Sequence, residues 1–539
     1  MIVGPAEAQP LRLDESPVIE TTSPGAPAGA NAAAAAAREA AGAAQASPSA
    51  PPRAKAAAKP PAPIVVKRVV FGASRHLEPA DLARIEAALI GTRHAGDAAL
   101  AAAVGRASDP IWVEKKQALA KATVAGVDRR DGTVRIEFFE AEVGEVRMPG
   151  TATSRADYLA WRFGIRSGDL ADTARIEERT QRLVATDGAA VDVAFAPGKG
   201  RGATDLTVKT AEPEKSGAQI SVDNHGEEIK GRERLNLGFR IAELTGWNDP
   251  LRLSSTVSRG SATGTLSYVR AIGPDGTLLS LAGTADWSLT GRAPRTESLA
   301  TAFDVGIDTP WIAGPGLVVR TSAGLTLFRE TSDLARVAIK RQEGQALTFG
   351  GALTWKGEGR YLAIAPSIRA VLYDDRIGRR SAIGSRQALL ALQAGHALGE
   401  DWAATVTAAG QLALDDDVPS KYLFAATGHS AVRGYPLNLE QAASGWYARS
   451  QIERSRPFRP FGEALGLSPY LFGDVGEAFD LDGTRHTRRG FLAASGVGLA
   501  ATLTEGWGGE VYLAKPLTDV PGFVANEAWT VQFRLAKSF

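Results

Sequence analysis

Few side chains in this sequence are spaced in a way that could support catalysis. None of the six histidines forms a pair at metal-binding spacing; they are His76, His94, His225, His396, His429 and His486. Gly428-His429-Ser430 resembles the start of a nucleophile elbow, but Val432 takes the place of the second glycine and no helix is predicted to follow. The run APGKGRGATD precedes a predicted strand, which favours a hairpin turn over a phosphate-binding loop. We therefore expect no enzyme, no metal site and no cofactor.

An arginine and an aspartate in the C-terminal half could form a different kind of site. Arg433 lies in GHSAVRGYPLNLE, residues 428–440, a long connection between two segments patterned as strands. Phe472, Asp474 and Gly476, in YLFGDVGEAF, are two residues apart and therefore share one face of a predicted strand. A guanidinium and a carboxylate can pair through two parallel hydrogen bonds, so these residues could hold a loop against a strand. Whether they meet depends on the elements that carry them.

The composition leaves few classes of protein open. The net charge of +1 gives no case for nucleic-acid binding, because the basic stripe that such proteins need is absent. The absence of cysteine excludes disulfides, thiolate zinc sites and cysteine nucleophiles. No apolar run reaches the roughly 18 residues that a membrane-spanning helix needs, so a chain that crosses a membrane must do so as a closed barrel.

From Lys215 onward the sequence alternates with a period of two, as half-buried strands require. Sixteen such segments begin near residues 218, 234, 251, 263, 277, 298, 317, 346, 361, 388, 402, 446, 468, 490, 509 and 528. Pro366 is awkward inside one of them, because proline cannot donate to a ladder. Short connections such as GPDG alternate with long ones such as SLTGRAPRTE and DDRIGRRSAIGSR. The pattern predicts a mainly β protein with a 16-stranded antiparallel transmembrane β-barrel over residues 214–539; a soluble sandwich is the alternative.

In such a barrel the loop containing Arg433 emerges on the extracellular side, and Asp474 faces the lumen. On the lipid face of the same strand we expect Leu471, Val475 and Ala478. The loop is predicted to fold into the lumen, where Arg433 pairs with Asp474, Gly434 allows a tight turn and Tyr435 packs on the barrel wall. A solvated Arg433 in an exposed loop is the alternative.

Two copies of one small α+β unit precede the barrel. The first, residues 64–142, has strands predicted over IVVKRVVF, KATVAGVD and TVRIEFFE and helices over EPADLARIEAALIG and GDAALAAAVGR. The second, residues 143–213, repeats the order strand, helix, helix, strand, strand.

Residues 1–63 are rich in Ala and Pro and have too little apolar bulk to form a core. Within them, residues 31–46 could form a helix capped by Asn31, or the segment could be a flexible linker. Ala6-Glu7-Ala8 has the form of a signal-peptidase site, which suggests that the numbering begins within a leader; a cytoplasmic start with a chance match is the alternative.

Several motifs together resemble the TpsB transporters of two-partner secretion, also called hemolysin secretion/activation proteins. They are VRGY at Val432 to Tyr435, the F-x-D-x-G motif at Phe472, Asp474 and Gly476, the two repeats, and the C-terminal Phe539. The resemblance covers about residues 64–539 and includes Asp223, Asn224, Gly226 and Gly231 in ISVDNHGEEIKGRERLNLGF. The first repeat departs from the family pattern, because ASDPIWVEKKQALAKATV lacks a Gly-aromatic pair after its second helix.

The resemblance implies an outer-membrane transporter whose two periplasmic POTRA domains recognise an unfolded TpsA-type exoprotein, which then passes through the barrel to the cell surface. It implies that Arg433 contacts Asp474 when the sixth extracellular loop folds into the pore, and that residues 31–46 are the candidate for a plug helix. Outer-membrane lipid and, during biogenesis, the barrel-assembly machinery are further expected partners, with Phe539 as the C-terminal signature. A barrel-assembly factor of the same superfamily is the main alternative, although such factors usually carry three or more POTRA units. A passive porin is the third possibility.

Overall fold

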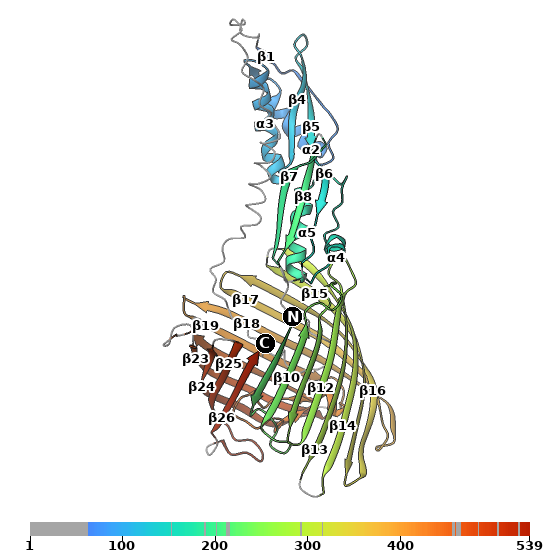
Figure 1. Ribbon diagram of the computed structural model, residues 1–539, viewed down its shortest axis with the longest axis vertical. Coiled ribbons are helices and arrows are strands. Elements are labelled where there is room, and N and C mark those ends of the chain that lie inside the picture. Colours follow the sequence, from blue (N-terminus) through green and yellow to red (C-terminus); the bar gives the residue numbers. More distant parts are fainter. Residues whose placement is uncertain are drawn as a thin grey trace. The chain divides into compact units, whose positions relative to one another are not determined.

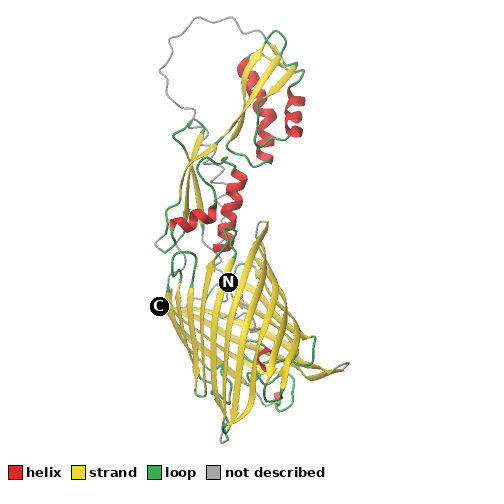
Figure 2. Cartoon of the chain, turned by 90° about the vertical axis from the view of Figure 1, so that its right-hand side faces the viewer, coloured by secondary structure: helices red, strands yellow, loops and turns green. Residues whose placement is uncertain are grey.

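The computed structural model describes residues 63–539, apart from residues 152, 188–189, 201, 212–215, 292–293, 315, 455–456, 458, 460–464, 483–484, 504–505 and 526–528. The segment 31–46, expected as a plug helix or a linker, lies outside the described residues. The described chain forms two compact units, with the boundary at residues 212–213 (Figure 1). The α-helices belong to the first unit, and the second is built mainly of strands (Figure 2).

In the second unit sixteen antiparallel strands pair in sequence order and close into a barrel, as predicted. The strands are β9 (Gly217–Asp223), β10 (Arg234–Ile241), β11 (Leu251–Ser258), β12 (Ser261–Ala271), β13 (Leu278–Thr290), β14 (Thr296–Gly314), β15 (Leu317–Leu334), β16 (Val337–Gly357), β17 (Arg360–Asp375), β18 (Arg380–Leu398), β19 (Trp402–Ala413), β22 (Ser444–Arg454), β23 (Leu465–Asp482), β24 (Arg485–Leu503), β25 (Trp507–Pro516) and β26 (Thr530–Ser538). The last strand pairs with the first, from Arg534 opposite Asp223 to Ser538 opposite Gln219.

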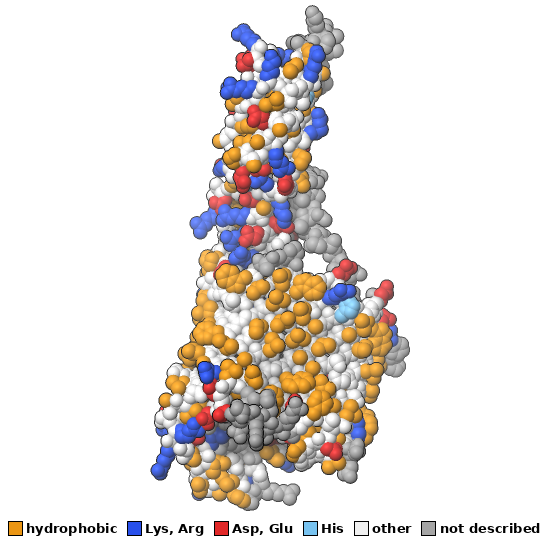
Figure 3. Space-filling model, turned by 180° about the vertical axis from the view of Figure 1, so that it is seen from behind, with side chains coloured by type: hydrophobic (Ala, Val, Ile, Leu, Met, Phe, Trp, Pro, Cys, Tyr) orange, Lys and Arg blue, Asp and Glu red, His pale blue; other side chains and the backbone are white. Residues whose placement is uncertain are grey.

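The alternation of side chains gives the barrel an apolar outer face and a more polar inner face. Leu235 and Leu237 of β10 are exposed on the outside, whereas Asn236 between them donates to Asp223 on the inside. Hydrophobic side chains cover much of the outer face (Figure 3). Exposed tryptophans lie toward both ends of the strands, as in membrane barrels: Trp311, Trp355, Trp402 and Trp507 at the end that carries the C-terminus, and Trp287, Trp446 and Trp529 at the other.

Five neighbouring strands, β14 to β18, are 16 to 21 residues long, whereas about 9–11 residues span a bilayer. The predicted long loops are therefore shorter than expected. Half of SLTGRAPRTE is strand, because β13 ends at Thr290 and β14 begins at Thr296, and most of DDRIGRRSAIGSR is strand, because only residues 376–379 separate β17 from β18. Beyond the bilayer the outer face of a strand can be polar, so strand pairing continues after the apolar alternation has ended.

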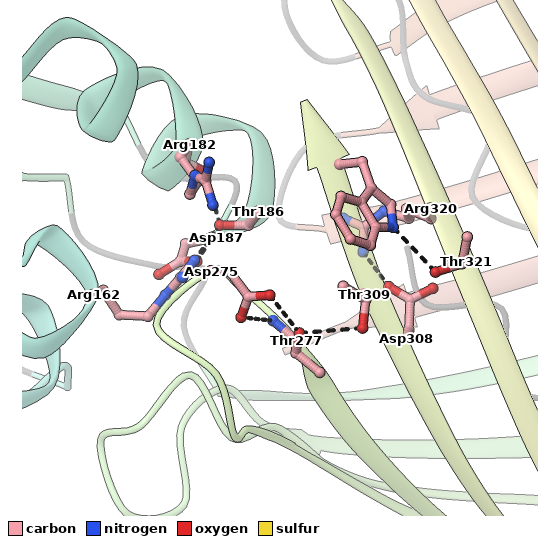
Figure 4. Close-up of polar contacts among 11 residues, drawn as sticks. Arg162, Arg182, Thr186, Asp187, Asp275, Thr277, Asp308, Thr309, Arg320 and Thr321 are labelled. Atoms are coloured by element: carbon pink, nitrogen blue, oxygen red, sulfur yellow. Dashed lines mark hydrogen bonds and ion pairs between the residues drawn. The ribbon is translucent and has the colours of Figure 1, made fainter. Parts of the chain in front are cut away.

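The barrel is irregular at a proline in β17 and at the turn before β13. Pro366 lies where the ladder between β16 and β17 is interrupted, between the pairs Gly350–Ser367 and Leu353–Ile364, as expected for a residue that cannot donate to a ladder. On its other side it stays in register with Leu390 of β18. At the turn before β13, Thr277 donates to Asp275 at 2.8 Å, and its hydroxyl lies 3.2 Å from that of Thr309 on β14 (Figure 4).

The first unit contains two repeats with the predicted order of elements. The first repeat has the sheet β2-β5-β4 and two helices: β2 (Arg68–Phe71), α2 (Pro79–Leu89), α3 (Asp97–Glu114), β4 (Ala120–Asp128) and β5 (Thr133–Glu140). The second has the sheet β6-β8-β7 and two helices: β6 (Glu142–Arg147), α4 (Ala156–Phe163), α5 (Thr173–Asp187), β7 (Val191–Pro197) and β8 (Ala203–Thr210). In the second repeat the buried Arg162 of α4 donates to Asp187 at 2.6 Å (Figure 4). No helix among the described residues is both long and apolar enough to cross a membrane.

Two elements of the first repeat differ from their predictions. IVVKRVVF forms two strands rather than one: β1 (Ile64–Val65) pairs with β3 (Arg93–His94), and β2 pairs in parallel with β5. The backbone changes partner between them, where Val66 donates to the carbonyl of Thr92 and Lys67 to that of Gly132. Helix α3 continues through Pro110 to Glu114, because Ile111 and Trp112 extend its buried face.

A polar junction connects the two repeats. Gln117 donates to the carboxylate of Asp172 at 2.7 Å, and the amide of Ala118 donates to the hydroxyl of Thr173 at 3.0 Å. Asp172 also accepts the amide of Arg175 at 3.0 Å and so caps the first turn of α5. The carboxylate of Asp172 therefore both caps helix α5 of the second repeat and binds Gln117 of the first repeat.

Candidate functional site

The connection between β19 and β22, residues 414–443, folds into the barrel lumen; we call it the lumenal loop. Its two arms pair through β20 (Phe424–Ala425) and β21 (Gln441–Ala442). The second arm begins at residue 430, and its residues 431–435 are buried. Ala431, Val432 and Tyr435 form a cluster with inward-facing residues of three strands: Tyr447 on β22, Ala478 on β23, and Leu492 and Ala494 on β24.

Arg433 and Asp474 form a buried, bidentate ion pair next to Val432 of this cluster. Arg433 Nε lies 2.7 Å from Asp474 Oδ2, and Nη2 lies 2.8 Å from Oδ1. The backbone amide of Arg433 also donates to Oδ2 at 3.1 Å. The two residues are 2% and 1% exposed, so the pair is shielded from water. Such a pair resists separation, because breaking it leaves a charge buried without its partner.

Two further side chains hold the guanidinium of Arg433. Its Nη1 donates to Gln451 Oε1 on β22 at 3.0 Å. Its flat face lies over the ring of Phe472, with 3.7 Å between the guanidinium carbon and the ring centre. Phe472 and Asp474 of the strand motif thus contact the same guanidinium, one at its face and the other at its edge.

The two glycines of the motifs allow close approach between the loop and the wall. Val432 is fully buried against Gly476, where an added Cβ would stand 2.9 Å from Val432 Cγ2. Gly434 has a φ of +90°, in the left-handed region that favours glycine, and an added Cβ there would stand 3.2 Å from the side chains of Ala514 and Pro516.

Tyr435 packs both on the wall and on a neighbouring loop. Its hydroxyl lies 3.0 Å from the carbonyl oxygen of Ala493 on β24 and 2.8 Å from that of Thr518, in the connection between β25 and β26. Its ring lies 5.3 Å from that of Phe523 in the same connection. The structure therefore brings all four residues of VRGY and all three of the strand motif into one cluster.

Ala478 differs from its prediction. It is fully buried in the lumenal cluster, so the expectation that it faces lipid was wrong. A period of two counted from Asp474 places Ala478 on the inner face, and the structure follows that count. Leu471, on the opposite face, is 60% exposed as expected for a lipid-facing residue.

The first hairpin of the barrel contributes to its closure. Asp223 accepts from Arg234 Nε and from Asn236, each at 2.7 Å. Asn224 bridges to β26, donating to the carbonyl of Val531 and accepting the amide of Phe533, each at 2.9 Å. Gly231, with a φ of +107°, lies close to Gly226, where an added Cβ would stand 2.2 Å from the Gly231 carbonyl oxygen. At the other end of the same seam the amide of Phe539 donates to the carbonyl of Ala218 at 2.8 Å, and its side chain is 74% exposed.

Sequence reasoning missed several lumenal residues. The rings of His225 and His429 stack with 4.5 Å between their centres, joining the first hairpin to the lumenal loop. Tyr422 of the loop packs on Arg369 of β17. The inward direction of Arg369 could have been read from its place in YLAIAPSIRAVLY, whereas no periodicity marks Tyr422. Among the residues that the structure describes, no cluster of three or more His, Asp or Glu could hold a metal ion.

Comparisons with known proteins agree with this architecture. The family model described as haemolysin secretion/activation protein ShlB/FhaC/HecB matches residues 202–270 and 386–501, which include the first hairpin, Arg433 and Asp474. Heme/hemopexin transporter protein HuxB from Haemophilus influenzae is 21% identical over 422 residues, which cover 74% of each chain.

Two solved structures share the fold over most of the chain. CdiB from Escherichia coli has a TM-score of 0.70 and 17% identity, covering 93% of this chain and 95% of that chain. CdiB from Acinetobacter baumannii has a TM-score of 0.65 and 15% identity, covering 89% of this chain and 91% of that chain. The family match on the first hairpin and the lumenal loop, the similarity to HuxB, and the closed sixteen-stranded barrel after two α+β repeats together support a TpsB-type transporter and indicate an outer-membrane protein with its N-terminal domains in the periplasm.

Proposed function

We propose that this transporter binds an unfolded TpsA-type exoprotein through its periplasmic repeats and passes it through the barrel lumen to the cell surface. The observation that carries the proposal is the lumenal loop, held in the barrel by the buried pair of Arg433 and Asp474. A passive pore has no need of a loop fixed across its lumen. A transporter needs one, because its pore must stay closed until the exoprotein arrives.

The repeats offer edges to which an extended chain can add. In the described residues β4 pairs only with β5, and β7 pairs only with β8, so each has one free edge. An unfolded exoprotein can bind such an edge as an additional strand, with backbone hydrogen bonds that do not depend on its sequence. Capture at these edges keeps the exoprotein extended before it enters the barrel.

The barrel lumen offers a route for the exoprotein, and the lumenal loop controls whether this route is open. A barrel of about sixteen strands is wide enough for an aqueous channel. Removing one partner of a buried ion pair typically costs about 3–5 kcal/mol, so the pair of Arg433 and Asp474 keeps the closed arrangement populated at rest. Folding of the exoprotein outside the cell then makes its passage directional.

The first experiment is replacement of Arg433 by Ala in cells that also produce the cognate exoprotein. We expect export to be lost while the heat-modifiable barrel remains at its normal level in the outer membrane. Arg380→Met is the matched control, because it removes an Arg whose Nη1 donates to Asp417 of the same loop at 2.8 Å but which is largely exposed. Normal export by the Arg433→Ala protein would contradict the proposed lock.

A barrel-assembly factor is the second candidate function. It predicts that loss of this chain lowers the amounts of other outer-membrane barrels, whereas a dedicated exporter leaves them unchanged. We propose lipid as the environment of the outer face, and the barrel-assembly machinery as a partner during biogenesis that recognises the exposed Phe539. Quantifying outer-membrane proteins after deletion of the gene separates the two functions.

A further inference from the structure

The first arm of the lumenal loop lies on a different part of the barrel wall from Arg433. It contains a single 3-10 turn, η1 (Ser420–Tyr422), which places Tyr422 against the wall. Tyr422 is 4% exposed, and its ring packs edge-on against Phe328 of β15, with 5.5 Å between the ring centres. A tyrosine from a polar connection is thus buried as fully as a residue of the barrel core.

Arg369 of β17 covers the other side of this tyrosine. Its guanidinium carbon lies 4.4 Å from the centre of the Tyr422 ring, and the residue is 6% exposed. Within the described part of the chain no carboxylate lies at ion-pair distance from Arg369. Its Nη1 donates to the side chain of Gln387 on β18 at 3.2 Å. The charge of Arg369 is therefore stabilised by the ring face of Tyr422, which belongs to the loop, and by the amide oxygen of Gln387.

Hydrogen bonds fix the backbone of the same arm. The carbonyl oxygen of Tyr422 accepts from Gln387 Nε2 at 3.1 Å and from Gln411 Nε2, on β19, at 2.7 Å. The hydroxyl of Ser420 accepts from Lys340 on β16 at 2.7 Å and donates to Glu330 on β15 at 2.6 Å. The first arm consequently contacts the five consecutive strands β15 to β19.

The second arm contacts another part of the wall. Arg433 binds Asp474 on β23, Tyr435 binds the carbonyl of Ala493 on β24, and the carbonyl of Gly434 accepts from Thr530 on β26 at 2.8 Å. The arms share Gln411, which also donates to the carbonyl of Ala443 at 2.9 Å, and Phe424 of the first arm packs on Tyr447 of β22. Their other hydrogen bonds go to different strands. Breaking the pair of Arg433 and Asp474 removes no contact of Tyr422.

We propose that Tyr422 and Arg369 form a second anchor, which keeps the first arm on the wall when the pair of Arg433 and Asp474 opens. The loop then pivots about its first arm and clears the β22–β26 side of the lumen, without leaving the barrel. This inference rests on the proposed function, in which the loop gates the path of an exoprotein. Arg369 acts here as a positioning residue, since it contacts the loop through the Tyr422 ring.

Spin-label mobility in the full-length protein tests the anchor without any exoprotein. The natural sequence has no cysteine, so one introduced cysteine gives one labelled site. The label is placed at Leu423 in the first arm or at Ser430 in the second, and its spectrum is recorded for the parent, for Arg433→Ala, and for Arg433→Ala combined with Arg369→Met. We expect Arg433→Ala to sharpen the spectrum at position 430 while the spectrum at 423 stays broad. Adding Arg369→Met, or Tyr422→Ala in its place, should sharpen the spectrum at 423 as well.

Arg380→Met in the Arg433→Ala background is the matched control, and it should leave the label at 423 immobile. Heat-modifiability on gels confirms that each variant retains a folded barrel. A mobile label at 423 in the Arg433→Ala protein alone overturns the second anchor, and so does a label at 423 that stays immobile in both double variants. Because these spectra need no secreted partner, the anchor can fail while the proposed export function stands, and the reverse also holds.

Discussion

At the residue scale, the closed state of the lumenal loop depends on the absence of a side chain at Gly476 as well as on the ion pair. An added Cβ would stand 2.9 Å from Val432 Cγ2 and 2.8 Å from the carbonyl oxygen of Trp446. We expect Gly476→Ala to push Val432 from its site and to destabilise the closed loop by about 1–3 kcal/mol, the usual cost of overpacking. Increased cleavage of the loop by external protease would measure the displacement.

Gly473→Ala is the matched control on the same strand. Its added Cβ meets only Ser450 Oγ, at 3.7 Å, which is ordinary van der Waals contact. This variant should resist the protease as the parent does. Equal protease sensitivity of the two variants would show that the effect comes from weakening β23 in general and not from contact with the loop.

The residues of the cluster were predictable to different degrees. The pairing of Arg433 with Asp474 was expected because the parity of a strand sets the direction of Asp474, and a buried carboxylate needs a partner. The contact between Tyr422 and Arg369 was not expected, because the loop has no periodicity from which its course could be read. The alternation of β17 predicts only that Arg369 points inward, and no sequence pattern predicts the position of Tyr422.

At the element scale, the junction between the two repeats should weaken in acid. Burial alone would raise the pKa of Asp172. Hydrogen bonds from Gln117 and from backbone amides, together with the electrostatic interaction with His76, outweigh this effect and lower the pKa below its usual value of 3.8. A carboxyl whose pKa is lower in the folded state stabilises that state above its unfolded pKa and loses the contribution as the pH falls through the folded value. The junction should therefore be intact at neutral pH and loosen below pH 3.8.

Hydrogen exchange of the Ala118 amide measures this effect, because that amide donates to Thr173 across the junction. After correction for intrinsic rates, its protection should be constant from neutral pH down to about pH 4 and fall as the pH drops below 3.8. In Asp172→Asn the protection should be lower at neutral pH and nearly independent of pH over the same range. A wild-type profile as flat as that of Asp172→Asn would contradict the assignment.

The number of strands was predicted better than the positions of their ends. The period of two was enough for sixteen strands and their meander, because lipid and lumen impose opposite demands on successive side chains. The ends of β14 to β18 were not predicted, because the requirement for apolar outward-facing side chains ends at the membrane surface, whereas backbone pairing continues beyond it. In the first repeat the pattern of IVVKRVVF could not show that β1 and β2 pair with different strands.

At the scale of the whole molecule, the closed barrel separates the two candidate functions, because an exporter uses the lumen whereas an assembly factor would use an opening in the wall. The seam between β9 and β26 is the natural place to test this, since it joins the first strand of the barrel to the last. Ser221 and Ala536 lie directly opposite each other across it. Opposed residues in an antiparallel pair have Cα atoms about 4.5–5.5 Å apart, within the range that a disulfide bridges.

We therefore expect Ser221→Cys combined with Ala536→Cys to form a disulfide in the oxidising periplasm, in a chain that offers no competing cysteine. Export through the lumen does not require the seam to open, so the secreted amount of exoprotein should match that of either single variant, with and without reductant. The fraction cross-linked is read from gels under non-reducing conditions. Export that falls with the cross-linked fraction and returns on reduction would mean that the exoprotein or a nascent barrel leaves through the wall, and the lumenal route would have to be given up.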